Sequence, residues 1–143
     1  MNVKQDSATC KTEEKYNDAT LNRPAGERAI DAPSLLIDLP AFIRQIRQED
    51  AWKKNDRNSI TVFKTDDLRI VLGGLHEGAE MQPHKAEGIT GIQVMEGLLE
   101  INTDELSTNL KKGQMVAIHK GCNYRVVAAE ETIYLLTISD VGK

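Results

Sequence analysis

Short apolar runs alternate with turn residues over most of the second half of the chain. Apolar and β-branched runs predict strands at about residues 60–63, 68–72, 89–95, 98–103, 115–118 and 132–138, with turns at 65–67, 96–97 and 104–105. Gly73 and Gly74 interrupt the second strand and indicate a bulge or a close approach to the backbone. A series of about eight or more short strands, without βαβ alternation, predicts an all-β sandwich or jelly roll.

The first 57 residues follow a different pattern. Residues 1–20 are polar and mixed in charge, which predicts a flexible arm. Residues 21–57 predict an extension with a strand over 34–39 and a helix over about 39–53. We therefore expect three segments, the arm, this extension and a β-barrel over 58–140.

The predicted helix has a start signal and an apolar stripe. Asp38 is suited to cap it, and Pro40 is tolerated in a first turn, where its missing N–H costs nothing. The stripe follows at helical spacing and consists of Leu39, Phe42, Ile43 and Ile46. Trp52, the only tryptophan, is interpreted as a core anchor near the helix end rather than as a ligand contact.

Composition narrows the functional classes. The 143 residues suffice for one domain, and a net charge of −4 argues against nucleic-acid binding, which needs a basic surface. No apolar run approaches the roughly 18 residues of a membrane span, so we expect a cytoplasmic protein that starts at Met1 and does not bind membranes. Cys10 and Cys122 lie in unlike contexts and are interpreted as free thiols.

Two glycine-framed segments carry the family signal. Gly78, His84 and Gly97 fit the pattern G-x5-H-x-H-x3,4-E-x6-G, in which Ala86 stands at the second histidine position and Thr90 at the glutamate position. A second pattern, G-x5-P-x-G-x2-H-x3-N, is matched by its glycines only. Its glycines are Gly113 and Gly121, while His119 stands at the proline, Tyr124 at the histidine and Ala128 at the asparagine.

With these motifs, residues 58–140 resemble the cupin superfamily, in particular small single-domain bacterial cupins. The resemblance implies a double-stranded β-helix, a jelly-roll barrel, preceded here by the short N-terminal helix. It also implies homodimers, for which the run 34–39 is a candidate exchanged strand. In metal-binding cupins, three histidines and one glutamate hold Fe, Mn, Ni or Zn inside the barrel.

The metal-ligand positions are largely degenerate in this chain. Only His84 matches a ligand position, since Ala86 has no donor, Thr90 offers a weak neutral oxygen and Tyr124 would have to lose its phenolic proton. His76 and His119 are possible additional partners of His84. We therefore predict no cofactor, with a His84-centred divalent metal as the alternative.

The strand register of the cupin superfamily, applied to this chain, also implies a pocket. Ala86, Thr90, Ile92 and Val94 would project inward and leave His84 and Tyr124 as polar groups, which suits a small organic ligand but also a filled core. Glu77, Glu80 and Glu87 flank His84 and are interpreted as a solvated face.

Two functional hypotheses stay open. One is a metal-independent, non-catalytic cupin that binds a small molecule. The other is a metal-dependent dioxygenase or isomerase that uses His84 with unusual partners. The sequence leaves open whether the protein is an enzyme.

Overall fold

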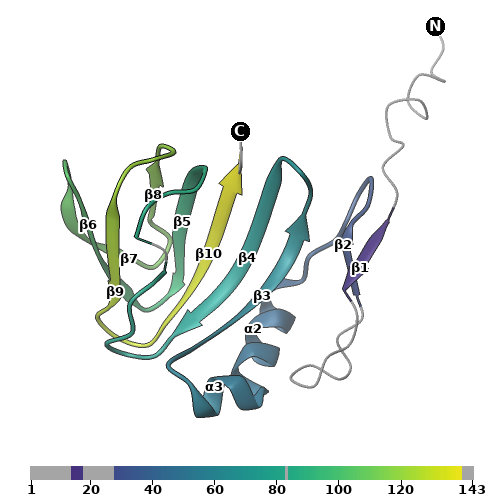
Figure 1. Ribbon diagram of the computed structural model, residues 1–143. Coiled ribbons are helices and arrows are strands. Elements are labelled where there is room, and N and C mark those ends of the chain that lie inside the picture. Colours follow the sequence, from purple (N-terminus) through teal and green to yellow (C-terminus); the bar gives the residue numbers. More distant parts are fainter. Residues whose placement is uncertain (1–13, 18–27, 83, 140–143) are drawn as a thin grey trace, which may run out of the picture. The chain divides into compact units, whose positions relative to one another are not determined.

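The computed structural model describes residues 14–17, 28–82 and 84–139, and its contacts divide the chain into two units, 1–37 and 38–143. In the first unit, β1 (Lys15–Asn17) pairs antiparallel with β2 (Arg28–Asp31) (Figure 1). Of the flexible arm predicted for 1–20, residues 15–17 form β1, and the other residues, apart from Glu14, lie outside the described part of the chain. Cys10 lies outside it as well, whereas Cys122 is an exposed free thiol.

The strand predicted over 34–39 is wrong. Residues 33–38 form no regular element, and Leu36 is 94% exposed, so its apolar side chain has no sheet on which to be buried. Leu39 already belongs to the following helix. An apolar run alone did not distinguish a strand from a connecting segment that leads into a helix cap.

The predicted helix is present but broken in two. Helix α2 (Leu39–Gln48) begins after Asp38, whose side chain accepts a hydrogen bond from the Ala41 N–H at 3.2 Å, and this confirms the expected cap. The backbone of Glu49 is extended, and α3 (Asp50–Lys54) follows it. Ile43 and Ile46 of the apolar stripe are buried, as is Trp52.

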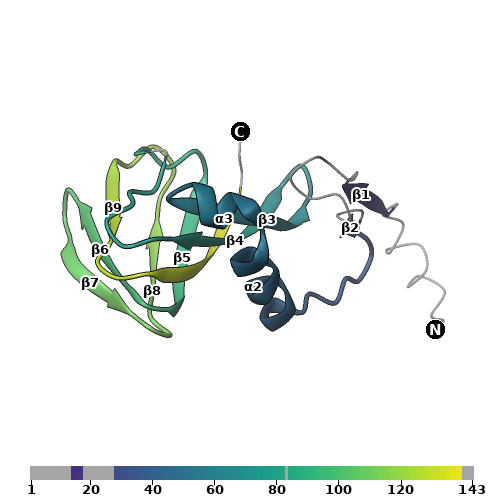
Figure 2. The same cartoon turned by 90° about the horizontal axis from the view of Figure 1, so that it is seen from below.

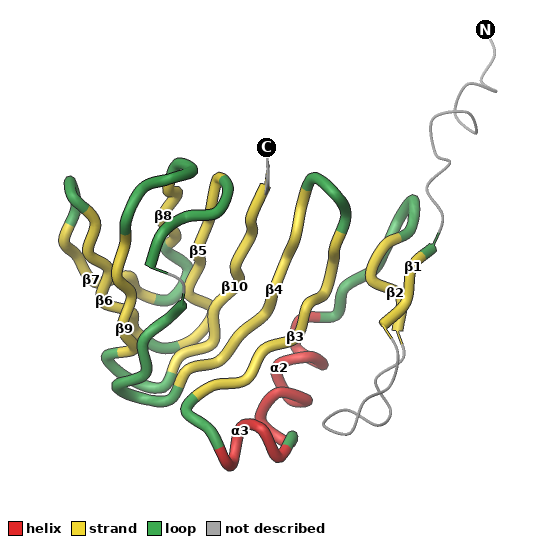
Figure 3. The backbone as a smooth tube through the Cα atoms, viewed as in Figure 1, coloured by secondary structure: helices red, strands yellow, loops and turns green. Residues whose placement is uncertain are grey.

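Two antiparallel sheets form the rest of the second unit (Figures 1 and 3). The five-stranded sheet has the order β3-β4-β10-β5-β8 and the three-stranded sheet the order β7-β6-β9. The strands are β3 (Arg57–Lys64), β4 (Leu68–Leu75), β5 (Ile89–Glu96), β6 (Leu98–Thr103), β7 (Ser107–Lys111), β8 (Met115–Ile118), β9 (Tyr124–Ala128) and β10 (Thr132–Ser139). These bounds confirm each of the strands predicted after residue 58.

Residues 79–82 and 84–86 run along the free edge of β9 without forming a regular strand. Isolated bridges join Glu80 to Val127 and Lys85 to Asn123. The two sheets with this segment make a jelly roll whose ladders do not close into a continuous barrel among the described residues. The fold class predicted from the sequence, all-β with a short N-terminal helix, is confirmed.

The core lies between the two sheets, and a second apolar layer lies under the helices. Buried core side chains include Leu75, Ile92, Val94, Leu99, Ile101, Leu110, Val126 and Tyr134. Helices α2 and α3 pack against β3, and α2 also packs against β4 (Figure 2). None of the described helices is both long and apolar enough to cross a bilayer.

Gly73 and Gly74 explain how both layers fit on one sheet. A Cβ atom on Gly73 would lie 2.2 Å from the ring of Tyr134, and one on Gly74 would lie 2.9 Å from the ring of Trp52. The two glycines thus admit one aromatic ring each, Tyr134 in the core and Trp52 from helix α3. The two glycines were expected to mark either a bulge or a close approach to the backbone, and the structure shows the close approach.

Candidate functional site at the rim of the small sheet

His84 lies in the irregular segment beside β9, not on a regular strand. Its carbonyl oxygen accepts a hydrogen bond from the Tyr124 N–H at 2.8 Å, and the Ala86 N–H donates to the Cys122 carbonyl at 3.0 Å. These bonds hold His84 opposite Tyr124, the residue at the histidine position of the second motif. The backbone therefore brings the two ligand positions of the two motifs together.

His84 and Tyr124 line the same hollow, which has a volume of about 390 Å³. Its other lining residues come from the end of β6, the turn that follows it and the start of β9. They are Asn102, Thr103, Asp104, Asn123 and Arg125. The hollow lies at the rim of the three-stranded sheet, and each of its lining residues carries a polar or charged side chain.

Glu80 joins two of the lining residues. One carboxylate oxygen, Oε2, lies 2.7 Å from His84 Nε2, and the other, Oε1, lies 3.1 Å from Arg125 Nη2 and 3.2 Å from Arg125 Nε. The Glu80 side chain is 27% exposed, against 50% for His84 and 61% for Arg125. The partly buried Glu80 carboxylate therefore holds the side-chain donors of His84 and Arg125, both of which are more exposed than Glu80 itself.

Tyr124 is largely buried, with 6% of its surface exposed, and belongs to the core cluster. Burial raises the pKa of its phenol above the ordinary value, and the nearby charge of Glu87 raises it further. Burial also raises the pKa of Tyr134, deeper in the core, to about 12. Both phenols thus stay neutral hydrogen-bonding groups at physiological pH.

The other predicted pocket residues lie in the packed interior. Ala86, Ile92 and Val94 belong to the core cluster, and Thr90 is buried with its hydroxyl donating to the Gly88 carbonyl at 2.9 Å. These four residues do not line the rim hollow. Of the predicted set, the structure brings only His84 and Tyr124 to a common hollow.

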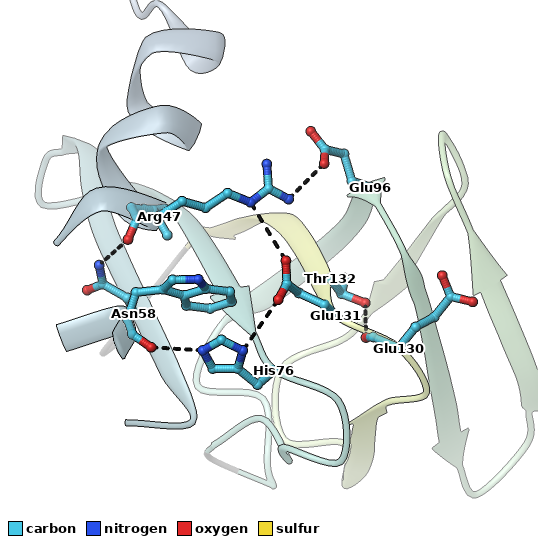
Figure 4. Close-up of polar contacts among 9 residues, drawn as sticks. Arg47, Asn58, His76, Glu96, Glu130, Glu131 and Thr132 are labelled. Atoms are coloured by element: carbon cyan, nitrogen blue, oxygen red, sulfur yellow. Dashed lines mark hydrogen bonds and ion pairs between the residues drawn. The ribbon is translucent and has the colours of Figure 1, made fainter. Parts of the chain in front are cut away.

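The other two histidines lie elsewhere. His76 stacks on Trp52 with ring centroids 3.6 Å apart, its Nε2 lies 2.8 Å from the Trp52 carbonyl oxygen, and its Nδ1 lies 3.4 Å from Glu131 (Figure 4). Glu131 also faces Arg47, which pairs with Glu96 at 2.8 Å. His76 thus belongs to a polar cluster at the helices, and the exposed His119 follows the end of β8.

The residues at the motif positions do not fit a metal ion. Within the described part of the chain, no three His, Cys, Asp or Glu side chains are grouped as a metal site would require. His84 Nε2 is engaged by Glu80, the Thr90 hydroxyl is engaged by a carbonyl, and burial opposes ionisation of Tyr124.

Sequence reasoning missed most of the hollow. Glu80 lies four residues before His84 in a segment that is not helical, so this spacing predicts no contact and the sequence favours a solvated face. Arg125 directly follows Tyr124 in the second motif. The polar residues of β6 and its turn carried no signal, because their proximity to His84 depends on how the sheet is assembled.

Comparisons with known proteins address the fold. No protein-family model and no curated protein sequence matches the chain. Among solved structures, salicylate 1,2-dioxygenase from Pseudoaminobacter salicylatoxidans, determined as adducts with gentisate, has a TM-score of 0.64 at 16% identity, over 77% of this chain and 34% of that one. A cupin superfamily protein from Desulfitobacterium hafniense has a TM-score of 0.56 at 15% identity, over 59% and 78% of the two chains.

A third structure describes the architecture in its own name. This RmlC-like cupin family protein with a double-stranded β-helix fold, from Methanocaldococcus jannaschii, has a TM-score of 0.54 at 12% identity, over 62% of this chain and 85% of that one. At these identities the similarity defines the fold alone. Together with the two antiparallel sheets and the glycine-framed motifs, it shows that this chain has the fold of the cupin superfamily, a double-stranded β-helix.

Proposed function

We propose that the protein binds a small polar organic molecule in the rim hollow, without a metal ion. The observation that carries the proposal is that His84 and Tyr124, from two motifs far apart in sequence, line one hollow of about 390 Å³. This volume falls within the range of about 300–1,000 Å³ that is usual for small-molecule sites. The neutral phenol and the imidazole supply hydrogen bonds to a ligand.

The metal-independent part of the proposal rests on the donors around His84. A divalent transition metal at a catalytic site ordinarily takes about three protein ligands. The metal-dependent alternative would need two further donors beside His84, yet the carboxylate that contacts His84, Glu80, is already paired with Arg125, and Tyr124 is neutral. The proposal is for binding and includes no chemical step.

Fragment binding followed by backbone amide NMR tests this proposal. We expect small polar fragments to shift the amide signals of Asn102, Asn123 and Tyr124. Tyr124→Phe should weaken binding about fivefold to tenfold, because it removes one hydrogen bond worth about 1 kcal/mol while keeping the ring. His84→Phe should have a similar effect.

His119→Phe is the matched control, since His119 is exposed and outside the hollow. It should leave fragment affinity unchanged. The proposal fails if no fragment shifts these signals, or if Tyr124→Phe only lowers the melting temperature and leaves the affinity as it was.

A further inference from the structure

We infer that Glu80 positions His84 and Arg125 so that the rim hollow selects a neutral polyhydroxylated molecule. This inference rests on the proposed function and names the ligand class. Its basis is the arrangement of one carboxylate between two side chains that both line the hollow.

The Glu80 carboxylate determines what His84 offers to a ligand. A carboxylate only accepts hydrogen bonds, so at 2.7 Å the neutral imidazole must carry its proton on Nε2. Nδ1 has no partner among the described residues. It accepts a hydrogen bond in the neutral imidazole and donates one in the imidazolium, and a ligand hydroxyl can pair with either form.

Glu80 is itself held by the backbone. Its bridge to Val127 is flanked by two hydrogen bonds, from the Ala128 N–H to the Ala79 carbonyl at 2.9 Å and from the Met81 N–H to the Val126 carbonyl at 2.9 Å. The carboxylate thus projects from a segment fixed to β9, which also carries Arg125. Such support keeps the side chains of His84 and Arg125, which would contact the ligand, in a defined geometry.

The charges around the hollow disfavour an anion. Apart from His84, the charged groups at the hollow are Arg125, which is positive and already paired with Glu80, and Asp104, which is negative, so the three charges sum to a negative value. Glu87 adds a further negative charge near Tyr124. The excess of negative charge would repel a ligand carboxylate or phosphate. In addition, Glu80 already accepts hydrogen bonds from part of the Arg125 guanidinium, which leaves fewer donors for an anion.

The remaining lining groups are neutral and form hydrogen bonds. The Thr103 hydroxyl accepts from the Leu106 N–H at 3.0 Å, and its own proton remains available for donation. The Asn102 amide oxygen already accepts a hydrogen bond from the Ser107 hydroxyl at 2.7 Å, which leaves its NH₂ group, and Asn123 offers a further amide group. Because a hydroxyl both donates and accepts, a ligand with several hydroxyls satisfies Asp104, the amides, His84 and Arg125 together, whereas an apolar molecule would leave them unpaired.

Three probes with the same six-carbon chain test the ligand class on the full-length protein. Sorbitol is a neutral polyol, gluconate is a polyol with a carboxylate, and hexan-1-ol is largely apolar. In amide NMR titrations, we expect sorbitol to shift the signals of the hollow at a concentration about fivefold lower than gluconate does. Hexan-1-ol should leave them unchanged.

Variants of Glu80 test its positioning role. Glu80→Ala should weaken sorbitol binding about fivefold to tenfold, and Glu80→Gln, which keeps an acceptor for His84, should weaken it less. In parallel, the ¹⁵N signals of the His84 ring should report one tautomer in the wild type and a mixture in Glu80→Ala. Glu77→Ala is the control, because Glu77 is exposed, lies in the same loop and does not line the hollow.

Each outcome is decisive for the inference. Tighter binding of gluconate or hexan-1-ol than of sorbitol, or wild-type sorbitol affinity in Glu80→Ala, overturns it while leaving a ligand site in the hollow. Absence of any shift with sorbitol also overturns it, and the fragment experiment then decides separately whether the hollow binds other molecules. If Glu80→Ala does not fold, Glu80→Gln carries the same comparison.

Discussion

The four motif glycines occupy turns that only glycine adopts without strain. Gly78, Gly97, Gly113 and Gly121 have φ angles of +88°, +101°, +86° and +87°. A side chain in this region costs about 1–2 kcal/mol. The motif glycines therefore follow from the backbone path, whereas the positions between them depend on the chemistry of the site and can change while the fold is kept.

Two of these glycines give a matched test. Around Gly113, a Cβ atom would meet nothing within 4 Å, but a Cβ on Gly97 would lie 2.3 Å from the Glu131 carbonyl oxygen. We expect Gly113→Ala to lower the free energy of unfolding by about 1 kcal/mol. Gly97→Ala should lower it by about 1–3 kcal/mol more, because the backbone must move. Urea denaturation measures both, and equal losses would contradict this account.

Tyr134 gives the domain an alkaline limit. Its folded-state pKa is raised to about 12 by burial, above the unfolded value near 10, so the folded state retains a proton that the unfolded state loses. Its stabilising contribution is complete below pH 10 and is lost as the pH rises from about 10 to 12. We expect the wild type to lose about 2 kcal/mol through this group by pH 12, and Tyr134→Phe to lose less over that interval. Urea denaturation across this pH range measures the difference, and identical pH dependence in the two proteins would refute the prediction.

At the scale of elements, the helices are attached by aromatic packing and a polar cluster. Trp52 packs on Gly74 and stacks on His76, while Arg47 reaches Glu96 and Glu131 from α2 (Figure 4). The ion pairs are substantially exposed and contribute little, since such pairs are worth about 0–1 kcal/mol. Apolar burial is therefore the main attachment of the helices to the sheet.

Removing the Trp52 ring tests this attachment. We expect Trp52→Ala to lower the free energy of unfolding by about 3–5 kcal/mol, because it leaves a cavity between α3 and Gly74. Lys53→Ala, on the exposed side of the same helix, should change it by less than about 0.5 kcal/mol. Similar effects of the two substitutions in thermal denaturation would show that the helices contribute little to the stability of the fold.

At the scale of the whole molecule, the sequence predicted the strands well because each strand is a local apolar run between turn residues. It predicted no strand at 15–17 and an incorrect one at 34–39, because strand formation there depends on whether a partner strand is available. Of the residues that line the rim hollow, the motif spacing singled out only His84 and Tyr124. Glu80, Asn102 and Arg125 converge through sheet assembly, which local patterns do not encode.

The homodimer stays a prediction. The five-stranded sheet has β3 and β8 at its edges, and Met115 on β8 is 58% exposed. Unpaired edges and exposed apolar side chains favour association with a second copy. We expect light scattering at micromolar concentration to give twice the monomer mass, and Met115→Lys to shift the equilibrium toward monomer if β8 contributes. A wild-type monomer would contradict the expected assembly.

Metal content tests the central claim most directly, because metal-independent binding requires that His84 hold no transition metal. Protein prepared without a histidine tag should contain far less than one Fe, Mn, Ni or Zn ion per chain by elemental analysis, and His84→Ala should leave that content unchanged. Stoichiometric metal in the native protein that is lost in His84→Ala would contradict the account.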